Sequence, residues 1–231
     1  MNPNKTARLA GFLYLLMVPF AVFSIKYLPS ILIVPGDASA TANNIVASVS
    51  LFRLGIVSAL FVQLINLFLV LVLYKLLKHV NKNHALLMVI LFVVSIPITM
   101  LNELNQFAAL ILSSGTEYLS TFSPDQLHAL VPLFLDLHEQ GITIAGIFWG
   151  LWLFPLGYLV FKSGFLPGIL GILLMIGCFG YLIESFVVIL VPSFNVNIAI
   201  FTFWGEILFP LWLLIKGVNV EEWEKRALES A

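Results

Sequence analysis

Four polar side chains lie within five residues of one another in the stretch TMLNELNQFAAL, inside a long apolar run. They are Asn102, Glu103, Asn105 and Gln106. A carboxyl group beside side-chain amides can carry a proton or hold a small cation. Because an ionisable group in lipid is costly, it usually faces the bundle interior or a water-filled cavity. The stretch therefore indicates a polar site whose chemistry depends on the elements around it.

The spacing of the polar residues predicts that they share a helix face. Thr99, Asn102 and Gln106 recur at steps of three and four residues, which stacks them on one side of an α-helix. Other apolar segments carry amides and carboxylates, and an arginine opens one of them. We expect these residues to form one pocket in the outer half of the membrane. The expected pocket residues are Arg53, Gln63, Asn66, Asn102, Glu103, Gln106, Glu184 and Glu206, with Asp136, His138 and Glu139 at its outer rim.

The composition requires lipid as the main solvent of the chain. Hydrophobic residues make up 61% and charged residues 10% of the 231 residues, whereas ordinary soluble domains carry about 25% charged residues. A soluble fold of this length has too little interior for that apolar content. The net charge of −1 lacks the basic excess that is typical of proteins that bind nucleic acid. The lipid bilayer is therefore the first expected partner.

Long continuous apolar runs predict helices rather than barrel strands, because they lack an alternation of period two. A spanning helix needs about 20 mainly apolar residues. We expect an all-α integral membrane protein, a six-span transmembrane helical bundle that forms a single domain over residues 1–231. The spans are expected near residues 9–28, 54–77, 86–112, 140–161, 166–191 and 198–215.

The basic residues predict the orientation of the bundle, because cytoplasmic loops carry an excess of lysine and arginine. Only Lys26 and Arg53 fall on the outer side of this topology. We therefore expect a multi-pass protein of the bacterial inner membrane with cytoplasmic N- and C-termini. The basic residues on the cytoplasmic side are Lys5, Arg8, Lys75, Lys78, Lys82, Lys162, Lys216, Lys225 and Arg226.

The second outer loop is expected to contain a short helix. Ser123 is a good N-cap residue, and Pro124 suits the first helical position. Pro132 would interrupt a straight helix that continued to Lys162. We therefore expect a separate interfacial helix over residues 124–131.

Three interpretations of the polar cluster stay open. It binds or transports a small cation, a proton or a polar solute; it is purely structural and bridges helices; or it belongs to an intramembrane, metal-dependent hydrolase. His138 and Glu139 suggest the last, but Ile142 stands where the H-E-x-x-H zinc motif needs histidine. We expect no metal site and no cofactor, and we favour a protein that is not an enzyme. A homo-oligomer is left open, as is an accessory role in the envelope.

Several segments resemble a bacterial family of multi-pass membrane proteins, the domain of unknown function forty-three eighty-six. They are SLFRLGI (50–56), the long segment at 147–185 that ends in GYLIES, and GEILFPLWLLIKGVN (205–219). The resemblance runs over nearly the whole chain and implies a multi-pass membrane topology. It implies no activity and no catalytic residues. Gly168 follows Pro167 where the family often has arginine, which removes one basic residue from an inner loop.

Overall fold

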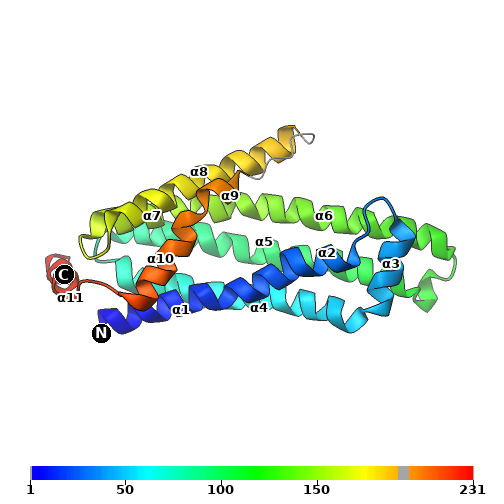
Figure 1. Ribbon diagram of the computed structural model, residues 1–231, viewed down its shortest axis with the longest axis horizontal. Helices are drawn as coiled ribbons and strands as arrows, with labels where there is room; N and C mark the ends of the chain where they lie inside the picture. Colours follow the sequence, from blue (N-terminus) through cyan, green and yellow to red (C-terminus); the bar gives the residue numbers. More distant parts are fainter. Residues whose placement is uncertain (1, 192–197, 231) are drawn as a thin grey trace. The chain divides into compact units, whose positions relative to one another are not determined.

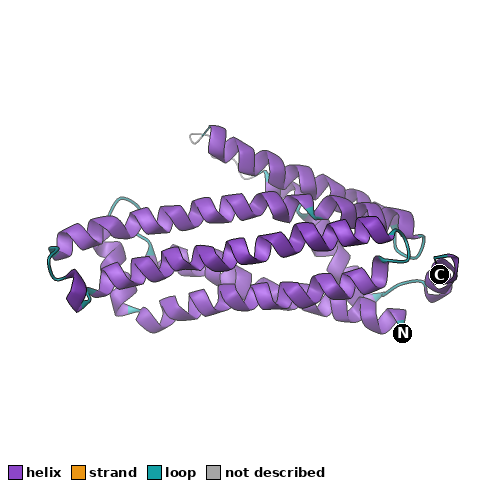
Figure 2. Cartoon of the chain, turned by 180° about the vertical axis from the view of Figure 1, so that it is seen from behind, coloured by secondary structure: helices purple, strands orange, loops and turns teal. Residues whose placement is uncertain are grey.

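The computed structural model describes residues 2–191 and 198–230. These residues form helices and loops, with no strand among them (Figure 2). The all-α expectation is confirmed. The single domain expected over residues 1–231 also includes 1, 192–197 and 231, which lie outside the described residues.

The helices follow one another through short connections (Figure 1). In chain order they are α1 (Pro3–Val22), the π-helix η1 (Phe23–Tyr27), α2 (Leu28–Leu32), α3 (Ala38–Ala47), α4 (Val49–Leu77), α5 (Lys82–Ser114), the 3-10 helix η2 (Glu117–Leu119), α6 (Pro124–Leu151), α7 (Leu153–Ser163), α8 (Gly168–Leu190), α9 (Ala199–Thr202), α10 (Trp204–Ile215) and α11 (Val220–Glu229).

Among the described residues, five helical segments are long and apolar enough to cross a membrane. They are Pro3–Leu32, Val49–Leu77, Lys82–Ser114, Pro124–Ser163 and Gly168–Leu190. The sixth expected span, at 198–215, consists of the four-residue α9 and the 12-residue α10. Neither helix alone reaches the length of about 20 residues that a spanning helix needs.

The separate interfacial helix expected over residues 124–131 is a wrong prediction. Helix α6 begins at Pro124 and runs through Pro132 to Leu151. Ser123 caps its start as expected, since its Oγ accepts from Gln126 N at 3.3 Å while Gln126 Oε1 accepts from Ser123 N at 2.9 Å. Pro132 removes one backbone hydrogen bond, to the carbonyl of residue 128. The rest of this 28-residue helix and its buried face outweigh that loss.

The described chain divides into two compact units, which we describe separately. Unit 1 comprises Met1–Leu16, Ile65–Ile96 and Thr143–Ala231, and unit 2 comprises Met17–Leu64 and Pro97–Ile142. Unit 1 contains nine basic and six acidic residues, a formal charge of +3. Unit 2 contains two basic and six acidic residues, a formal charge of −4.

Unit 2 is held by an apolar core to which α2, α3, α4, α5 and α6 all contribute. Around that core, α5 has the inverse of the pattern found in soluble helices. Asn102, Glu103 and Gln106 are 7%, 4% and 6% exposed, whereas Leu101 and Leu104 are 65% and 61% exposed. Polar side chains that face inward and apolar ones that face outward are typical of a helix in lipid. The core residues are Leu28, Leu32, Ala42, Ile45, Phe52, Ile56, Ala109, Leu110, Leu112, Leu127, Val131 and Leu135.

Within unit 1, α7 and α8 lie side by side (Figure 1). Glycines allow this approach: a Cβ atom added at Gly157 would lie 2.5 Å from the carbonyl oxygen of Gly171. Small residues of this kind commonly mark helix contacts in membranes. The close contact between α7 and α8 therefore depends on Gly157 and Gly171.

Helix α11 of unit 1 is anchored by hydrogen bonds to the ends of two helices that are distant in sequence. The indole Nε1 of Trp223 donates to the carbonyl oxygen of Leu76 at 2.9 Å. Arg226 Nη2 donates to the carbonyl oxygen of Lys162 at 3.2 Å. Helix α11 is therefore hydrogen-bonded to both the end of α4 and the end of α7.

Candidate functional site

A cluster of hydrogen-bonded polar side chains in unit 2 joins α5 to α6. His138 Nε2 lies 3.2 Å from Oε1 of Glu103 and 3.1 Å from Nε2 of Gln106. The amide Nδ2 of Asn102 donates to the backbone carbonyl of His138 at 2.8 Å. His138 therefore contacts three residues on the inward face of α5. We call these four residues the Glu103 site.

A glycine allows α6 to approach α5 at this point. A Cβ atom built on Gly141 would collide with the side-chain amide of Asn102. Gly141 lies one turn after His138 on α6. The hydrogen bond from Asn102 to the His138 carbonyl therefore depends on the missing side chain.

The geometry requires a hydrogen atom between Glu103 and His138. An unprotonated Nε2 presents a lone pair, and so does a carboxylate oxygen, so the two would repel at 3.2 Å. Either Glu103 carries the proton and donates to Nε2, or Nε2–H donates to the carboxylate. Gln106 suits both states, because rotation of its amide presents either the NH₂ group or the oxygen to Nε2. A neutral imidazole in its Nε2–H tautomer satisfies the second arrangement without an additional proton, so the contact fixes where a hydrogen lies and leaves the net charge of the pair open.

One oxygen of the same carboxyl group has no partner among the described residues. Glu103 Oε2 is buried and accepts no hydrogen bond from them. A buried acceptor without a partner costs roughly 1–3 kcal/mol. A cation or a hydrogen-bond donor at this oxygen would remove that cost.

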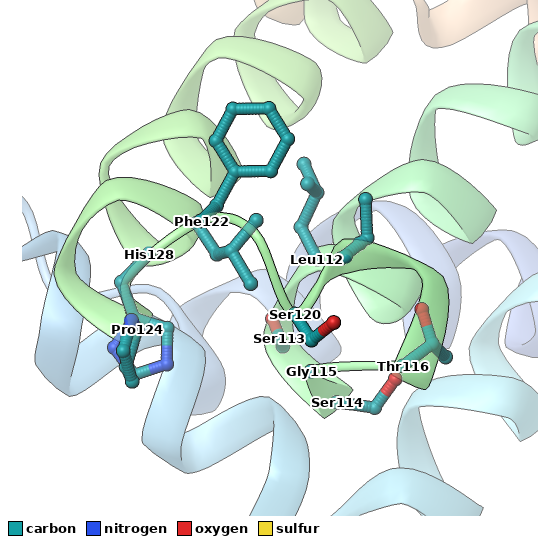
Figure 3. A pocket seen from close by; sticks show the side chains of 11 residues that line it. Leu112, Ser113, Ser114, Gly115, Thr116, Ser120, Phe122, Pro124 and His128 are labelled. Carbon is teal, nitrogen blue, oxygen red and sulfur yellow. The ribbon is translucent and has the colours of Figure 1, made fainter.

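Unit 2 also contains a pocket of about 360 Å³ at the loop between α5 and α6 (Figure 3). Thr116 Oγ1 in its wall is buried and has no hydrogen-bond partner in the described part of the chain. The pocket lies two turns beyond Gln106 along α5, and the buried apolar residues Ala109, Val131 and Leu135 lie between the two along the helices. The polar residues of its wall are Ser113, Ser114, Thr116, Ser120 and His128.

The remaining expected site residues of unit 2 differ in burial. Gln63 is buried, and its Oε1 has no partner among the residues that the structure describes. Arg53 is exposed and forms no ion pair with a described carboxylate. Asp136 and Glu139, expected at the rim, are exposed. His138, also expected at the rim, is in contact with Glu103 instead.

The other three expected pocket residues, Asn66, Glu184 and Glu206, belong to unit 1. Asn66 is buried there. Glu206 has its own partners: its Oε2 accepts from the Tyr14 hydroxyl at 2.9 Å, and the Tyr181 hydroxyl is a second hydrogen-bond donor to this carboxyl group. Its Oε1 is buried without a partner among the described residues.

Sequence reasoning missed Tyr14 altogether. It lies 192 residues from Glu206, so no spacing rule could connect the two. Its ring also stacks on Trp152 with centroids 6.3 Å apart. Within the described residues, no three histidine, cysteine or acidic side chains gather as a metal site.

Comparison with known proteins identifies the family to which this chain belongs. The family model described as Domain of unknown function (DUF4386) matches residues 9–217. A relative from Archaeoglobus fulgidus, described as an uncharacterized protein, is 42% identical over 81 residues. That match covers 35% of this chain and 49% of the relative, so the chain spans about half of the relative's length. No solved structure matches the chain. Because the family model covers most of the sequence, the chain belongs to the DUF4386 family of domains of unknown function.

Proposed function

We propose that this protein is a six-span inner-membrane protein that exchanges a proton for a small monovalent cation at the Glu103 site. The proposal rests above all on one observation. A buried carboxyl group shares a hydrogen with His138 through Oε1, while its Oε2 has no partner in the described residues. A group of this kind can hold either ion, and binding one displaces the other.

The charge balance explains why the exchange would be one for one. A protonated Glu103 beside neutral His138, or a carboxylate beside imidazolium, has no net charge. Loss of that proton leaves one negative charge in apolar surroundings, which is unfavourable. A monovalent cation at Oε2 restores neutrality, and Nε2–H still donates to Oε1. The site therefore favours one cation for each proton released.

The pocket at the α5–α6 loop would be the entrance for the cation. Its hydroxyl groups can replace part of the hydration shell of a small cation. The acidic charge of unit 2 would draw cations toward it. The apolar side chains of Ala109, Val131 and Leu135 would close the path between the pocket and Glu103 until the helices move.

Hydrogen bonds in unit 1 support an even number of crossings, with both termini on one side. Asn4 Oδ1, at the start of α1, accepts from Val218 N, just after α10, at 2.8 Å. Two segments that touch in this way lie at the same membrane face. With five long helical segments, the sixth crossing falls to α9 and α10. Residues 199–215 would extend about 25 Å as a helix, close to the hydrocarbon thickness of about 30 Å.

The distribution of basic residues supports a cytoplasmic location for that face. Nine of the 11 basic residues lie in unit 1, which also contains the segments joined by α11. An excess of lysine and arginine is typical of cytoplasmic loops. We also retain a single domain, because α1, α4, α5 and α6 each have residues in both units.

A structural role is the second candidate, because Asn102 links α5 to the α6 backbone. Interhelical hydrogen bonds of this type contribute about 0.6 kcal/mol on average. A linker of this kind needs no titratable pair. The two candidates therefore differ in what Glu103→Gln should do.

The test is cation-driven proton movement in liposomes that contain the purified protein and a pH-sensitive dye. A pulse of Li⁺, Na⁺ or K⁺ outside should release protons from wild-type vesicles for at least one of the ions. Glu103→Gln should abolish that movement, and Asp136→Asn, which alters an exposed carboxylate, should preserve it. Proton movement that is equal in wild-type and Glu103→Gln vesicles would favour the structural role.

A further inference from the structure

A second pocket lies in unit 1, at the end of the unit where the chain leaves α10. It has a volume of about 380 Å³ and is formed by the α7–α8 loop together with the end of α10 and the residues that follow it. Trp212, Lys216 and Asn219 contribute its polar groups. No acidic residue lines this pocket in the described chain. We propose that it binds the phosphate-bearing headgroup of an anionic phospholipid.

The pocket is preformed by contacts within unit 1. Asn219 N donates to the carbonyl oxygen of Phe165 at 3.1 Å and fixes one wall to the other. Gly164 and Gly217 have φ angles of +76° and +72°, which only glycine adopts without strain. The walls therefore do not need to rearrange when a headgroup enters.

The polar groups of the pocket suit a phosphate. Lys216 is exposed and supplies a positive charge. Asn219 uses its side-chain oxygen to cap α11 by accepting from Glu222 N at 3.3 Å, which leaves its NH₂ group to donate. The carbonyl end of α10 carries partial negative charge and would repel an anion. Binding must therefore depend on Lys216.

An apolar helix face leads away from the pocket, which favours a lipid over free phosphate. Leu208, Leu211, Trp212 and Ile215 of α10 are exposed at steps of one helical turn. A stripe of this kind matches an acyl chain that continues from the headgroup. Tryptophan and lysine at the end of a membrane helix are also typical of the headgroup level.

The net positive charge of unit 1 favours an anionic lipid, and it outweighs Glu221 and Glu222, which follow the pocket residue Asn219 in the first turn of α11. Asn4 accepts a hydrogen bond from Val218 beside the pocket, and Lys5 and Arg8 follow on the same end of α1. Unit 1 as a whole carries a formal charge of +3. A zwitterionic headgroup would gain less from this surrounding charge.

Native mass spectrometry of the purified protein with phosphatidylglycerol or phosphatidylcholine of identical acyl chains tests the proposal. Wild type should bind phosphatidylglycerol more tightly than phosphatidylcholine. Lys216→Gln should weaken phosphatidylglycerol binding about fivefold, the effect of one lysine near an anionic headgroup. Lys216→Arg should keep the preference, and so should Lys225→Gln, which removes an exposed lysine of α11 outside the pocket.

Three results would overturn the assignment. The first is equal phosphatidylglycerol binding by wild type and Lys216→Gln. The second is an equal loss in Lys225→Gln, which would indicate non-specific charge. The third is displacement of the lipid by inorganic phosphate at millimolar concentration, which would identify a free-anion site. The melting temperature of each variant is measured alongside, and Lys216→Arg separates loss of charge from loss of fold.

Discussion

The Nε2 atom of His138 lies 3.2 Å from Oε1 of Glu103, and the two side chains are 14% and 5% exposed. A hydrogen must lie between these atoms, because two lone pairs would otherwise face each other. The pair therefore forms a structural contact between α5 and α6, and under the exchange proposal it also contains the proton that is released.

Replacement of His138 should destabilise the protein by more than the lost packing alone. In His138→Ala both oxygens of Glu103 lack a partner, and a buried unpaired acceptor costs roughly 1–3 kcal/mol. Glu103→Gln combined with His138→Ala should regain part of that loss, because an amide is less costly to bury than a carboxylate. Thermal unfolding in detergent measures both variants. If the double variant is no more stable than His138→Ala, the buried carboxylate is not the cause.

Gly141→Ala should separate α6 from α5 at the Glu103 site. The added Cβ would collide with the Asn102 amide, so the hydrogen bond to the His138 carbonyl should break. We expect a loss of about 1–3 kcal/mol in stability, together with weaker proton exchange. Gly168→Ala is the matched control, because its Cβ would lie 3.3 Å from the edge of the Phe161 ring, a contact that a small shift relieves. Equal melting temperatures for Gly141→Ala and wild type would contradict this interpretation.

Tyr14→Phe should weaken unit 1 through Glu206. The variant removes the hydroxyl that donates to Glu206 Oε2 at 2.9 Å but keeps the ring that stacks on Trp152. We expect a loss of about 1–3 kcal/mol, the cost of an unsatisfied buried group. Tyr27→Phe, at an exposed tyrosine, should leave the melting temperature unchanged. A wild-type melting temperature for Tyr14→Phe would show that the bond contributes little.

Docking of α11 should weaken in acid. Partial burial, and the charge of Lys78 beside it, lower the pKa of His79 below its usual value of 6.5. Because the folded state disfavours the imidazolium, the contribution of His79 is complete above pH 6.5 and is lost as the pH falls toward the lowered pKa. His79 contacts Trp223 edge-on and Ser230 at 2.9 Å, so α11 should become less protected.

Hydrogen–deuterium exchange of α11, corrected for the intrinsic pH dependence, measures this effect. Wild type should lose protection between pH 7 and pH 5, and His79→Gln should not. The loss should be small, because the imidazole is only partly buried. The same pH dependence in His79→Gln would assign it to another group.

The inward face of α5 could be predicted from sequence, because helical spacing alone aligns Asn102 and Gln106 beside Glu103. The contact with His138 could not. Pro132 was expected to end a helix, which placed His138 in an outer loop, whereas burial of Val131 and Leu135 keeps α6 continuous through the proline. Local backbone preference was outweighed there by tertiary packing.

The sequence also could not predict which residues surround each buried carboxyl group. Hydropathy locates Glu206 in an apolar helix but carries no information about which helix it faces. Its partner Tyr14 comes from the first helix, a pairing that only the folded chain specifies. The short α10 illustrates the same limit, because an apolar run of sufficient length need not form one continuous helix.

The most direct test of the central claim is the number of protons released when a monovalent cation binds the purified protein. The measurement uses weakly buffered detergent solution at pH 7, a pH-indicator dye and saturating Li⁺, Na⁺ or K⁺. The exchange proposal predicts close to one proton per chain for the ion that binds wild type, and none for Glu103→Gln. Cation binding without proton release in wild type, or equal release in Glu103→Gln, would contradict it.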